Sequence, residues 1–280
     1  MSSIAITGCS SGFGRVTTLR FLRERWHVIA TVRRDEDRTS LIDEARRLGA
    51  ADHLTVVLAD ITRAEDVSRL RETVTSRAAP LTALVNNAGG AFPGLIELLP
   101  IEDLRAQLEI NVVAQIAITQ ALLPHLRAAR GTIINVSSVS GLIATPAIGA
   151  YTASKFALEA LSDVLRMEVA PLGVRVVVIE PGSSPTRIWE SGRARLLNQR
   201  TDHGPYAPLL STLKQRAEST AGGGFPPELF ADTVWKIVNT ATPKTRYLIP
   251  KKKRRALIIH RLLPDRVMDW MIGRRLNWKA

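Results

Sequence analysis

The sequence predicts an α/β fold in which one doubly wound parallel sheet of about seven strands forms a single domain. Short runs rich in valine and isoleucine alternate with longer stretches whose apolar residues recur at helical spacing. The strand candidates are apolar almost throughout, as expected for parallel strands that are covered on both faces. The chain has 280 residues, of which 45% are hydrophobic, and this is enough for one large core.

Strands and helices alternate along most of the chain, which requires right-handed crossovers and places ligands beyond the carboxyl ends of the strands. One segment, residues 183–225, breaks this alternation with three prolines and a triple glycine, so we predict a lid there. We predict strands at residues 4–7, 27–32, 54–58, 81–85, 132–136, 175–179 and 246–249. We predict helices at residues 15–25, 64–77, 101–129, 151–170 and 227–239.

A glycine-rich turn follows the first predicted strand, where residues 7–14 read Thr-Gly-Cys-Ser-Ser-Gly-Phe-Gly. The first two glycines allow a tight turn, and the third lets the next helix pack closely on the sheet. The helix N-terminus then offers free N–H groups and a positive dipole to a pyrophosphate. We therefore predict a dinucleotide site, with contacts from Gly8, Ser10, Ser11, Gly12, Phe13 and Gly14.

A tyrosine and a lysine, Tyr151 and Lys155, lie four residues apart in a predicted helix. The ordinary pKa of tyrosine is about 10, and an ammonium one helical turn away favours the phenolate and lowers that pKa. Such pairs are also common on exposed helices, so the pair alone does not define a catalytic site. Ser138 precedes Tyr151 by thirteen residues, and Ser137 and Ser140 compete with it as the serine of the site.

Six motifs in order resemble the short-chain dehydrogenase/reductase family, in its single-domain branch. They are the glycine turn, Asn86-Asn87-Ala88-Gly89, Asn111, Ser138, Tyr151-x-x-x-Lys155 and Pro181-Gly182. The resemblance covers residues 1–250, and its wording is nearest to the hydroxysteroid and retinol dehydrogenases. It implies a Rossmann-type NAD(P)-binding catalytic domain, a homodimer or homotetramer, and hydride transfer between nicotinamide and an alcohol/ketone or aldehyde.

The resemblance also implies the roles of four catalytic residues. Tyr151 would be the general acid in reduction and the base in oxidation, and Ser138 would polarise the substrate carbonyl. Lys155 would also bind the nicotinamide ribose, and Asn111 would hold a water that links Lys155 to solvent. Independently, Asn111 stands in an apolar helical run, where an unpaired polar group is costly, and this favours a functional role.

The second predicted strand ends at two arginines, where an acidic residue would bind the adenosine ribose of NAD. A guanidinium suits a phosphate, so we predict that NADP(H) is preferred over NAD(H). Arg33 would be the main ligand of the 2′-phosphate and Arg34 would assist; a solvated basic turn is the competing interpretation. The family resemblance adds contacts from Asp60, Ile61, Asn87, Ala88, Gly89, Pro181, Gly182 and Thr186.

The net charge of +12 is concentrated in a basic amphipathic tail, residues 251–280, which holds ten Lys/Arg and two Asp. A nucleic-acid-binding domain would carry its charge on the folded face, so we expect no nucleic-acid partner. The tail has two main interpretations: it covers the substrate pocket or a subunit interface, or it contacts an anionic membrane peripherally.

The sequence lacks the signals of a membrane span, of a secretory leader and of a metal site. No run approaches the roughly 20 apolar residues of a membrane span, and no basic leader precedes the first strand. With a single cysteine, we expect a cytoplasmic protein, membrane-peripheral at most. The histidines lack the spacing of metal ligands, so no metal is expected.

The segments expected around the substrate, residues 91–95, 142–148 and the lid with Ile188 and Trp189, are largely apolar. They favour a hydrophobic or neutral small-molecule substrate. The alternative function is a dinucleotide-binding sensor or scaffold without turnover. The complete catalytic set argues against this alternative, because a binding module does not need a matched proton donor.

Overall fold

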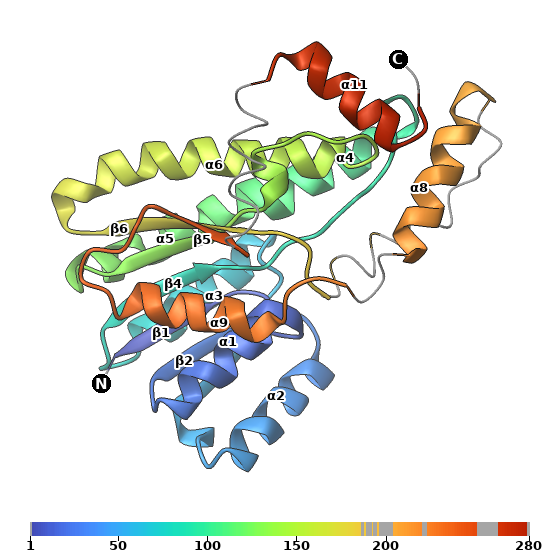
Figure 1. Ribbon diagram of the computed structural model, residues 1–280. Helices are drawn as coiled ribbons and strands as arrows, with labels where there is room; N and C mark the ends of the chain where they lie inside the picture. Colours follow the sequence, from blue (N-terminus) through green and yellow to red (C-terminus); the bar gives the residue numbers. More distant parts are fainter. Residues whose placement is uncertain are drawn as a thin grey trace.

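In the computed structural model a seven-stranded, fully parallel sheet forms the centre of the molecule, in the order β3-β2-β1-β4-β5-β6-β7 (Figure 1). The predicted fold class and all seven predicted strands are confirmed. The strands are β1 (Ser3–Ile6), β2 (His27–Val32), β3 (Leu54–Leu58), β4 (Leu81–Asn86), β5 (Thr132–Val136), β6 (Arg175–Pro181) and β7 (Arg246–Ile249). The structure describes residues 2–185, 188, 192, 195, 204–219, 223–250 and 263–278.

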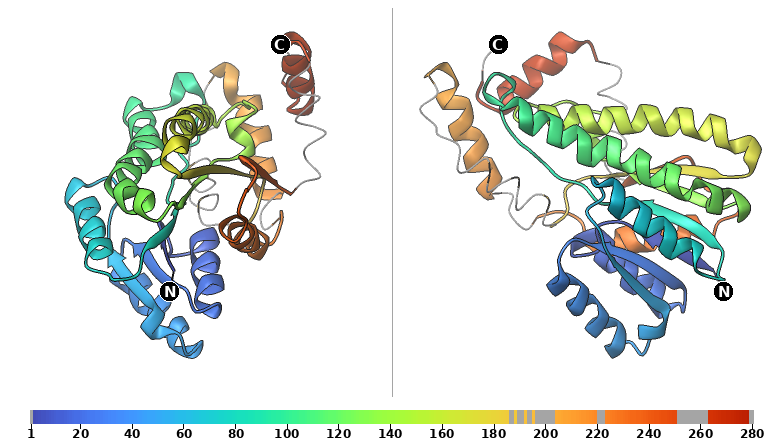
Figure 2. Two further views of the ribbon diagram at one scale, coloured as in Figure 1. Left: turned by 90° about the vertical axis from the view of Figure 1, so that its left-hand side faces the viewer. Right: turned by 180° about the vertical axis from the view of Figure 1, so that it is seen from behind.

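Helices cover both faces of the sheet: α1, α2 and α9 pack on one face, and α3, α5 and α6 on the other (Figure 2). The helices on the faces are α1 (Gly12–Arg23), α2 (Asp35–Arg47), α3 (Ala64–Thr75), α4 (Ile101–Leu108), α5 (Ala114–Ala128), α6 (Gly149–Val169) and α9 (Pro227–Val238). Two more, α8 (Ala207–Ser219) and α11 (Asp265–Arg275), lie together at one end of the molecule.

The alternation of side chains along each strand divides the core into two layers. On β1, Ile4 and Ile6 face the layer that holds Phe21 of α1 and Phe230 of α9, whereas Ala5 faces the layer of α3 and α5. All of these residues are buried, which explains why the strand sequences are apolar at consecutive positions. Successive side chains of a strand point to opposite faces, so one continuous apolar run packs against two separate sets of helices.

One predicted helix is interrupted in the structure, and one observed helix that packs on the sheet was not predicted. The predicted helix at residues 101–129 is interrupted by a π-helical turn, η3 (Glu109–Val113), and α5 tolerates Pro124 within it. Helix α2 was missed, because its first turn carries three acidic residues that resemble a polar loop. It is held by only two buried apolar residues, Leu41 and Ala45, so its periodic signal in the sequence is weak.

Among the described residues, one helical stretch, Ile101–Ala128, has the length and apolar composition of a membrane span. It is the stretch of α4, η3 and α5, and 44% of its apolar window is buried inside the protein. Helix α5 packs against β4 and α3, so its contacts with the sheet account for its composition. Its hydropathy is evidence for the core and carries no independent evidence for a bilayer.

Two glycines with similar backbone angles, Gly8 and Gly49, allow the close packing of the turn after β1 to be tested. Gly8 has φ +72°, and an added Cβ would lie 2.8 Å from the Cα of Ala88; Gly49 has φ +62° with no atom within 4 Å. We expect Gly49→Ala to lower the free energy of unfolding by about 1 kcal/mol through its left-handed backbone alone. Gly8→Ala should cost roughly 2–4 kcal/mol, because the clash is added to the same backbone strain. Urea unfolding of both variants checks this; equal losses would contradict the clash.

Candidate active site

The ends of β1 and β4 are tied together by a small hydrogen-bonded network. The Thr7 hydroxyl accepts from the N–H groups of Asn87 at 3.0 Å and Ala88 at 2.9 Å. The Asn87 amide in turn donates to the carbonyls of Thr7 at 2.8 Å and Gly8 at 3.1 Å. The Gly8 N–H donates to the hydroxyl of Thr31 on β2, at 3.1 Å. These bonds fix three neighbouring strand ends around the glycine turn.

The N-terminus of α1 fits the anionic part of a dinucleotide. Its N-cap residue, Ser11, makes no side-chain capping hydrogen bond, and the first turn contains no acidic residue. The backbone N–H groups of this turn are therefore not capped by the protein's own side chains and can bind a phosphate. Gly14 lets the helix approach the turn, because an added Cβ there would lie only 2.3 Å from the Gly8 carbonyl oxygen.

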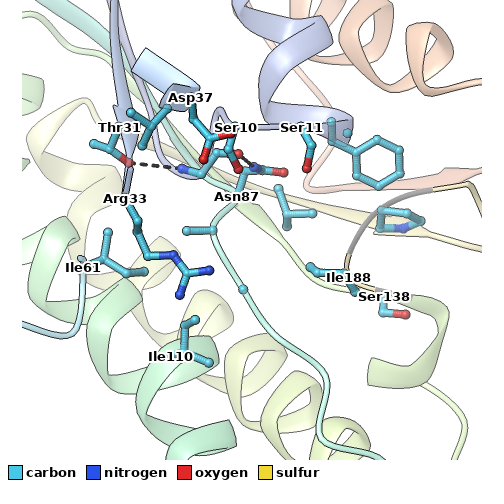
Figure 3. Close-up of a pocket in the computed structure, with 18 of the residues that line it drawn as sticks. Ser10, Ser11, Thr31, Arg33, Asp37, Ile61, Asn87, Ile110, Ser138 and Ile188 are labelled. Atoms are coloured by element: carbon cyan, nitrogen blue, oxygen red, sulfur yellow. Dashed lines mark hydrogen bonds between the residues drawn. The ribbon is translucent and has the colours of Figure 1, made fainter. Parts of the chain in front are cut away.

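A cavity of about 580 Å³ runs along the carboxyl ends of the strands, within the size range of ligand sites (Figure 3). It extends from the glycine turn to the tyrosine of α6. It brings together most of the residues predicted from the sequence. These are Gly8, Ser10, Ser11, Gly12, Phe13, Arg33, Arg34, Asp60, Ile61, Asn87, Ala88, Gly89, Ser138, Tyr151, Lys155, Pro181 and Gly182.

Three predicted site residues are not among the residues that line the cavity. Gly14 packs behind the turn, Asn111 is fully buried beneath the wall, and Thr186 lies outside the described residues, as does Trp189. Sequence analysis missed several lining residues, because they flank motifs without forming one. They include Thr31, Val32, Asp37, Ala59, Ile110 and Val136; Ser184 and Ile188 of the predicted lid segment and the competing serine, Ser137, also line the cavity.

The two arginines after β2 have different surroundings. The Arg34 guanidinium binds the Asp37 carboxylate through two hydrogen bonds, at 2.9 and 3.2 Å. Arg33 instead extends into the cavity, toward Ile61 and Ile110 (Figure 3). Burial raises the pKa of Asp60, but its hydrogen bonds from Thr62 and the nearby charge of Arg33 lower that pKa overall. Arg33 is thus the better placed of the two to meet an anion.

Ser138, Tyr151 and Lys155 meet at the other end of the cavity, and each is only 5–6% exposed. The hydroxyls of Tyr151 and Ser138 share a hydrogen bond, and the Ser140 N–H donates to the Ser138 oxygen at 3.0 Å. The Lys155 ammonium donates to the Val136 carbonyl at 2.8 Å and lies 5.6 Å from the centre of the Tyr151 ring. Two hydroxyls and an ammonium therefore face one short stretch of the cavity.

Burial decides the proton affinities of this pair. It raises the pKa of Tyr151 to about 12, against the opposing effect of the Ser138 hydrogen bond. It lowers the pKa of Lys155 to about 8, against the opposing charge of Glu159. In the protein alone the pKa of Tyr151 therefore lies above its ordinary value, opposite to the net lowering expected from the sequence, because desolvation is the largest effect.

Asn111 lies in the π-helical turn η3 and joins two parts of the site wall. Its amide donates to the Gly90 carbonyl at 3.1 Å and to the Ser154 hydroxyl at 3.0 Å, and it accepts from the Gly90 N–H at 3.0 Å. The side chain is thus fully used in holding the loop after β4 against α6. A π turn inside a long helix is a frequent feature of functional sites.

Comparison with known proteins identifies the family. A sequence model described as short chain dehydrogenase matches residues 2–196. The chain belongs to the short-chain dehydrogenase/reductase family, whose members are NAD(P)-dependent oxidoreductases, and it is an enzyme of this class.

Two relatives and one solved structure extend over nearly the whole chain. An NADPH-dependent 3-dehydrocapnine reductase of Ornithobacterium rhinotracheale is 34% identical, over 96% of this chain and 95% of the relative. A 3-ketodihydrosphingosine reductase of Bacteroides thetaiotaomicron is 32% identical, over 87% and 86%. The crystal structure of a short-chain dehydrogenase from Streptomyces avermitilis is similar at a TM-score of 0.78 and 27% identity, over 99% of this chain and 97% of that one.

The structural part of Asn111 can be measured directly. Asn111→Ala would leave the buried Gly90 N–H without its partner, so we expect a loss of about 2–4 kcal/mol in the free energy of unfolding. Asn239→Ala is the matched control, because its amide makes one hydrogen bond at the exposed end of α9. That variant should lose less than about 1 kcal/mol. Equal unfolding midpoints for the two variants would contradict a special role of Asn111 in the wall.

Proposed function

We propose that this enzyme is an NADP(H)-dependent reductase of a ketone carried on a long alkyl chain. The observation that carries the proposal is the position of the Ser138–Tyr151 pair, at the end of a cavity whose other end is a phosphate-binding helix N-terminus. A nicotinamide bound between them would supply the hydride. The protein then has to hold the carbonyl, deliver a proton and exclude water.

Each catalytic side chain has one task in this proposal. Ser138 donates a hydrogen bond to the carbonyl oxygen, and Tyr151 delivers the proton to the same oxygen. The buried ammonium of Lys155 stabilises the phenolate that forms when Tyr151 loses its proton. A pKa of about 12 keeps Tyr151 protonated at neutral pH, which suits a general acid in reduction.

An apolar cluster next to the site supports the class of substrate. We call it the apolar cap; its buried members come from the loop after β4, from the segment just before α6, from α8 and from the C-terminal segment. The Gly94 N–H donates to the carbonyl of Ala147 at 2.8 Å. Ala147 precedes Tyr151 by four residues, so this bond joins the cap to the start of the catalytic helix. The side chains of the cap are buried against one another and do not line the cavity, but an apolar neighbourhood of this kind beside the site favours an alkyl chain over a charged substrate. The cap consists of Leu95, Ala147, Leu209, Leu210 and Leu276.

The relatives support the same class. The names of two relatives identify them as reductases of 3-dehydrocapnine and of 3-ketodihydrosphingosine, and the second compound is an amino ketone on a long alkyl chain. The name of the first also specifies NADPH. These similarities, together with the apolar cap, favour a long-chain ketone over a small polar alcohol.

Preference for NADPH rests on Arg33. We expect Arg33→Ala to raise the KM for NADPH about tenfold to a hundredfold, because a charge-assisted contact to the 2′-phosphate would be lost. The KM for NADH should change less than about threefold. Arg34→Ala serves as the control, since its guanidinium is bound to Asp37. Equal changes with both cofactors, or a larger effect of Arg34→Ala, would contradict the assignment.

Catalysis by Tyr151 separates the reductase from a dinucleotide-binding sensor. NADPH oxidation would be followed with 2-alkanones of increasing chain length and with 3-ketodihydrosphingosine, and the long-chain ketones should give the highest kcat/KM. Tyr151→Phe should lower kcat by about 10²–10⁴ because the proton donor is lost. Its affinity for NADPH should stay within about twofold of the wild type. Turnover that does not depend on Tyr151 would contradict the mechanism; tight NADPH binding without any turnover would favour the sensor.

We further propose a cytoplasmic enzyme that contacts anionic membranes through α11. Its outer face presents Val267, Trp270, Met271 and Arg274 at helical spacing; Trp270 is 59% exposed, and Arg274 lies 5.4 Å from its ring. The inner face, with Ile272 and Leu276, packs at the apolar cap. An exposed tryptophan beside arginines suits a lipid–water interface, and the basic residues of the tail add electrostatic attraction.

Vesicle binding tests this contact. We expect the protein to sediment with phosphatidylglycerol vesicles at low salt and to be released by high salt, and we expect Trp270→Ser to weaken binding about tenfold. Leu229→Ser on α9 is the control, because Leu229 is also an exposed apolar residue but lies far from the tail. Equal binding of Trp270→Ser and the wild type would exclude α11 as the contact.

The oligomeric state is also a proposal, a homodimer or homotetramer. Apolar side chains that are exposed along α6, among them Phe156, Val164 and Met167, support an interface on this helix.

A further inference from the structure

A cluster of buried charges lies one helical turn beyond the catalytic lysine. We call Glu159, Asp163, Glu180 and Arg246 the charge cluster. The Arg246 guanidinium on β7 lies 3.1 Å from the Glu159 carboxylate, 2.7 Å from that of Asp163 and 3.4 Å from that of Glu180 on β6. Glu159 and Glu180 are only 7% and 4% exposed. One partly exposed cation thus holds two carboxylates in the interior.

Glu159 is also in direct reach of the catalytic residues. It follows Lys155 by four residues on α6, which places both side chains on the same face of the helix, on the order of 6 Å apart at their Cβ atoms. Ser137, the residue next to Ser138, lies beside its carboxylate and opposes the rise of its pKa. A Cβ added to Gly141 would lie 2.6 Å from the Ser137 hydroxyl and 3.2 Å from the Glu159 side chain. The absence of that Cβ keeps this polar contact tightly packed beneath the site.

The charged groups around this position favour a single ionised carboxylate next to Lys155. Burial, together with the nearby charge of Glu159, raises the pKa of Glu180 to about 7, against the opposing charge of Arg246. Burial also raises the pKa of Glu159, but Ser137 and Arg246 oppose that effect. When the two acids compete for charge, Glu159 is therefore the one that stays ionised, and its charge favours the ammonium form of Lys155.

A purely structural role would not require these two acids. Arg246 already has a strong partner in Asp163 near the surface, and two further carboxylates in the interior carry a desolvation penalty. Neutral side chains of similar size would fill the same space without that penalty. Because these carboxylates are buried next to the catalytic lysine, their desolvation penalty points to an electrostatic role in the site.

We propose that Glu159 is a positioning residue for the reaction: held by Arg246 and Ser137, it supplies the buried negative charge that keeps the Lys155 ammonium protonated while Tyr151 transfers its proton. Asp163 anchors Arg246 from the side of the cluster near the surface. The groups that face Lys155 are Tyr151 and Glu159 from α6, and Ser138 and the Val136 carbonyl from the end of β5. This inference rests on the proposed roles of Tyr151 and Lys155.

The test is the pH profile of kcat/KM for NADPH-dependent reduction of the best 2-alkanone. An ammonium that has lost its negative neighbour releases its proton at lower pH, so the basic limb should move toward acid in Glu159→Gln. We expect a shift of about half to one pH unit, which lowers kcat/KM at pH 9 about threefold to tenfold relative to wild type. Glu159→Asp retains the charge and should restore most of the shift.

Glu180→Gln is the matched control, because it removes the other buried acid from the same cluster. Its basic limb should stay within about 0.3 pH unit of the wild type, since Glu159, and not Glu180, is the carboxylate whose charge acts on Lys155. If Glu159→Gln only lowers the melting temperature and leaves the limb in place, Glu159 is structural and the proposal is wrong. An equal shift in Glu180→Gln would also overturn it, because the effect would then belong to the whole cluster.

A second measurement does not depend on turnover. The Kd of NADPH, followed by nicotinamide fluorescence between pH 6 and pH 10, reports the charge of Lys155 through its contact with the ribose. The rise of Kd at high pH should begin earlier in Glu159→Gln than in the wild type. If Glu159→Gln does not fold, Arg246→Gln replaces it, because Glu159 is easier to protonate without Arg246. The rise of Kd should then also begin at lower pH than in the wild type. Unchanged profiles in a protein whose Tyr151→Phe variant is inactive would overturn this inference and leave the proposed function intact.

Discussion

The burial of a polar stripe on helix α6 is the constraint on which the rest of the site depends. Tyr151, Lys155 and Glu159 succeed one another at intervals of four residues, and all three are less than a tenth exposed. Such groups are tolerated in an interior only when each has a partner. The end of β5, the turn after it and the start of β7 supply those partners, and they fix the position of the helix against the sheet. The catalytic geometry is a consequence of satisfying these polar groups.

The same requirement explains the strained and irregular parts of the wall. The π turn at Asn111 places an amide where it can hold both the loop after β4 and the start of α6. The glycine turn brings β1 so close to β4 that a single Cβ at Gly8 would touch the neighbouring backbone. These features reduce local stability, and the parallel sheet with its two apolar layers offsets that loss. The sheet therefore forms a rigid base beneath the cavity, and the catalytic residues are held in fixed positions at one end of it.

Much of this architecture was predictable, because its signals are local in the sequence. Buried strands leave apolar runs, and the turn after β1 leaves a fixed spacing of glycines. Helix α2 was not predictable in the same way, because it buries only two apolar residues beneath a charged surface. The partners of Arg34 and Lys155 could not be read either, since Asp37 is only one of several nearby acids and Glu159 resembles an ordinary helical glutamate.

The sequence by itself determined the fold class, the seven strands, and the identity of most of the residues that gather at the strand ends. Only the tertiary structure decided their electrostatics. Whether a tyrosine gains or loses acidity depends on how deeply it is buried and on which charges lie within a few ångströms. The fold buries Tyr151, and Glu159, the carboxylate that acts on Lys155, is held by Arg246, which is far from both in the chain. Proton affinity is therefore set by three-dimensional packing, which no local spacing of residues contains.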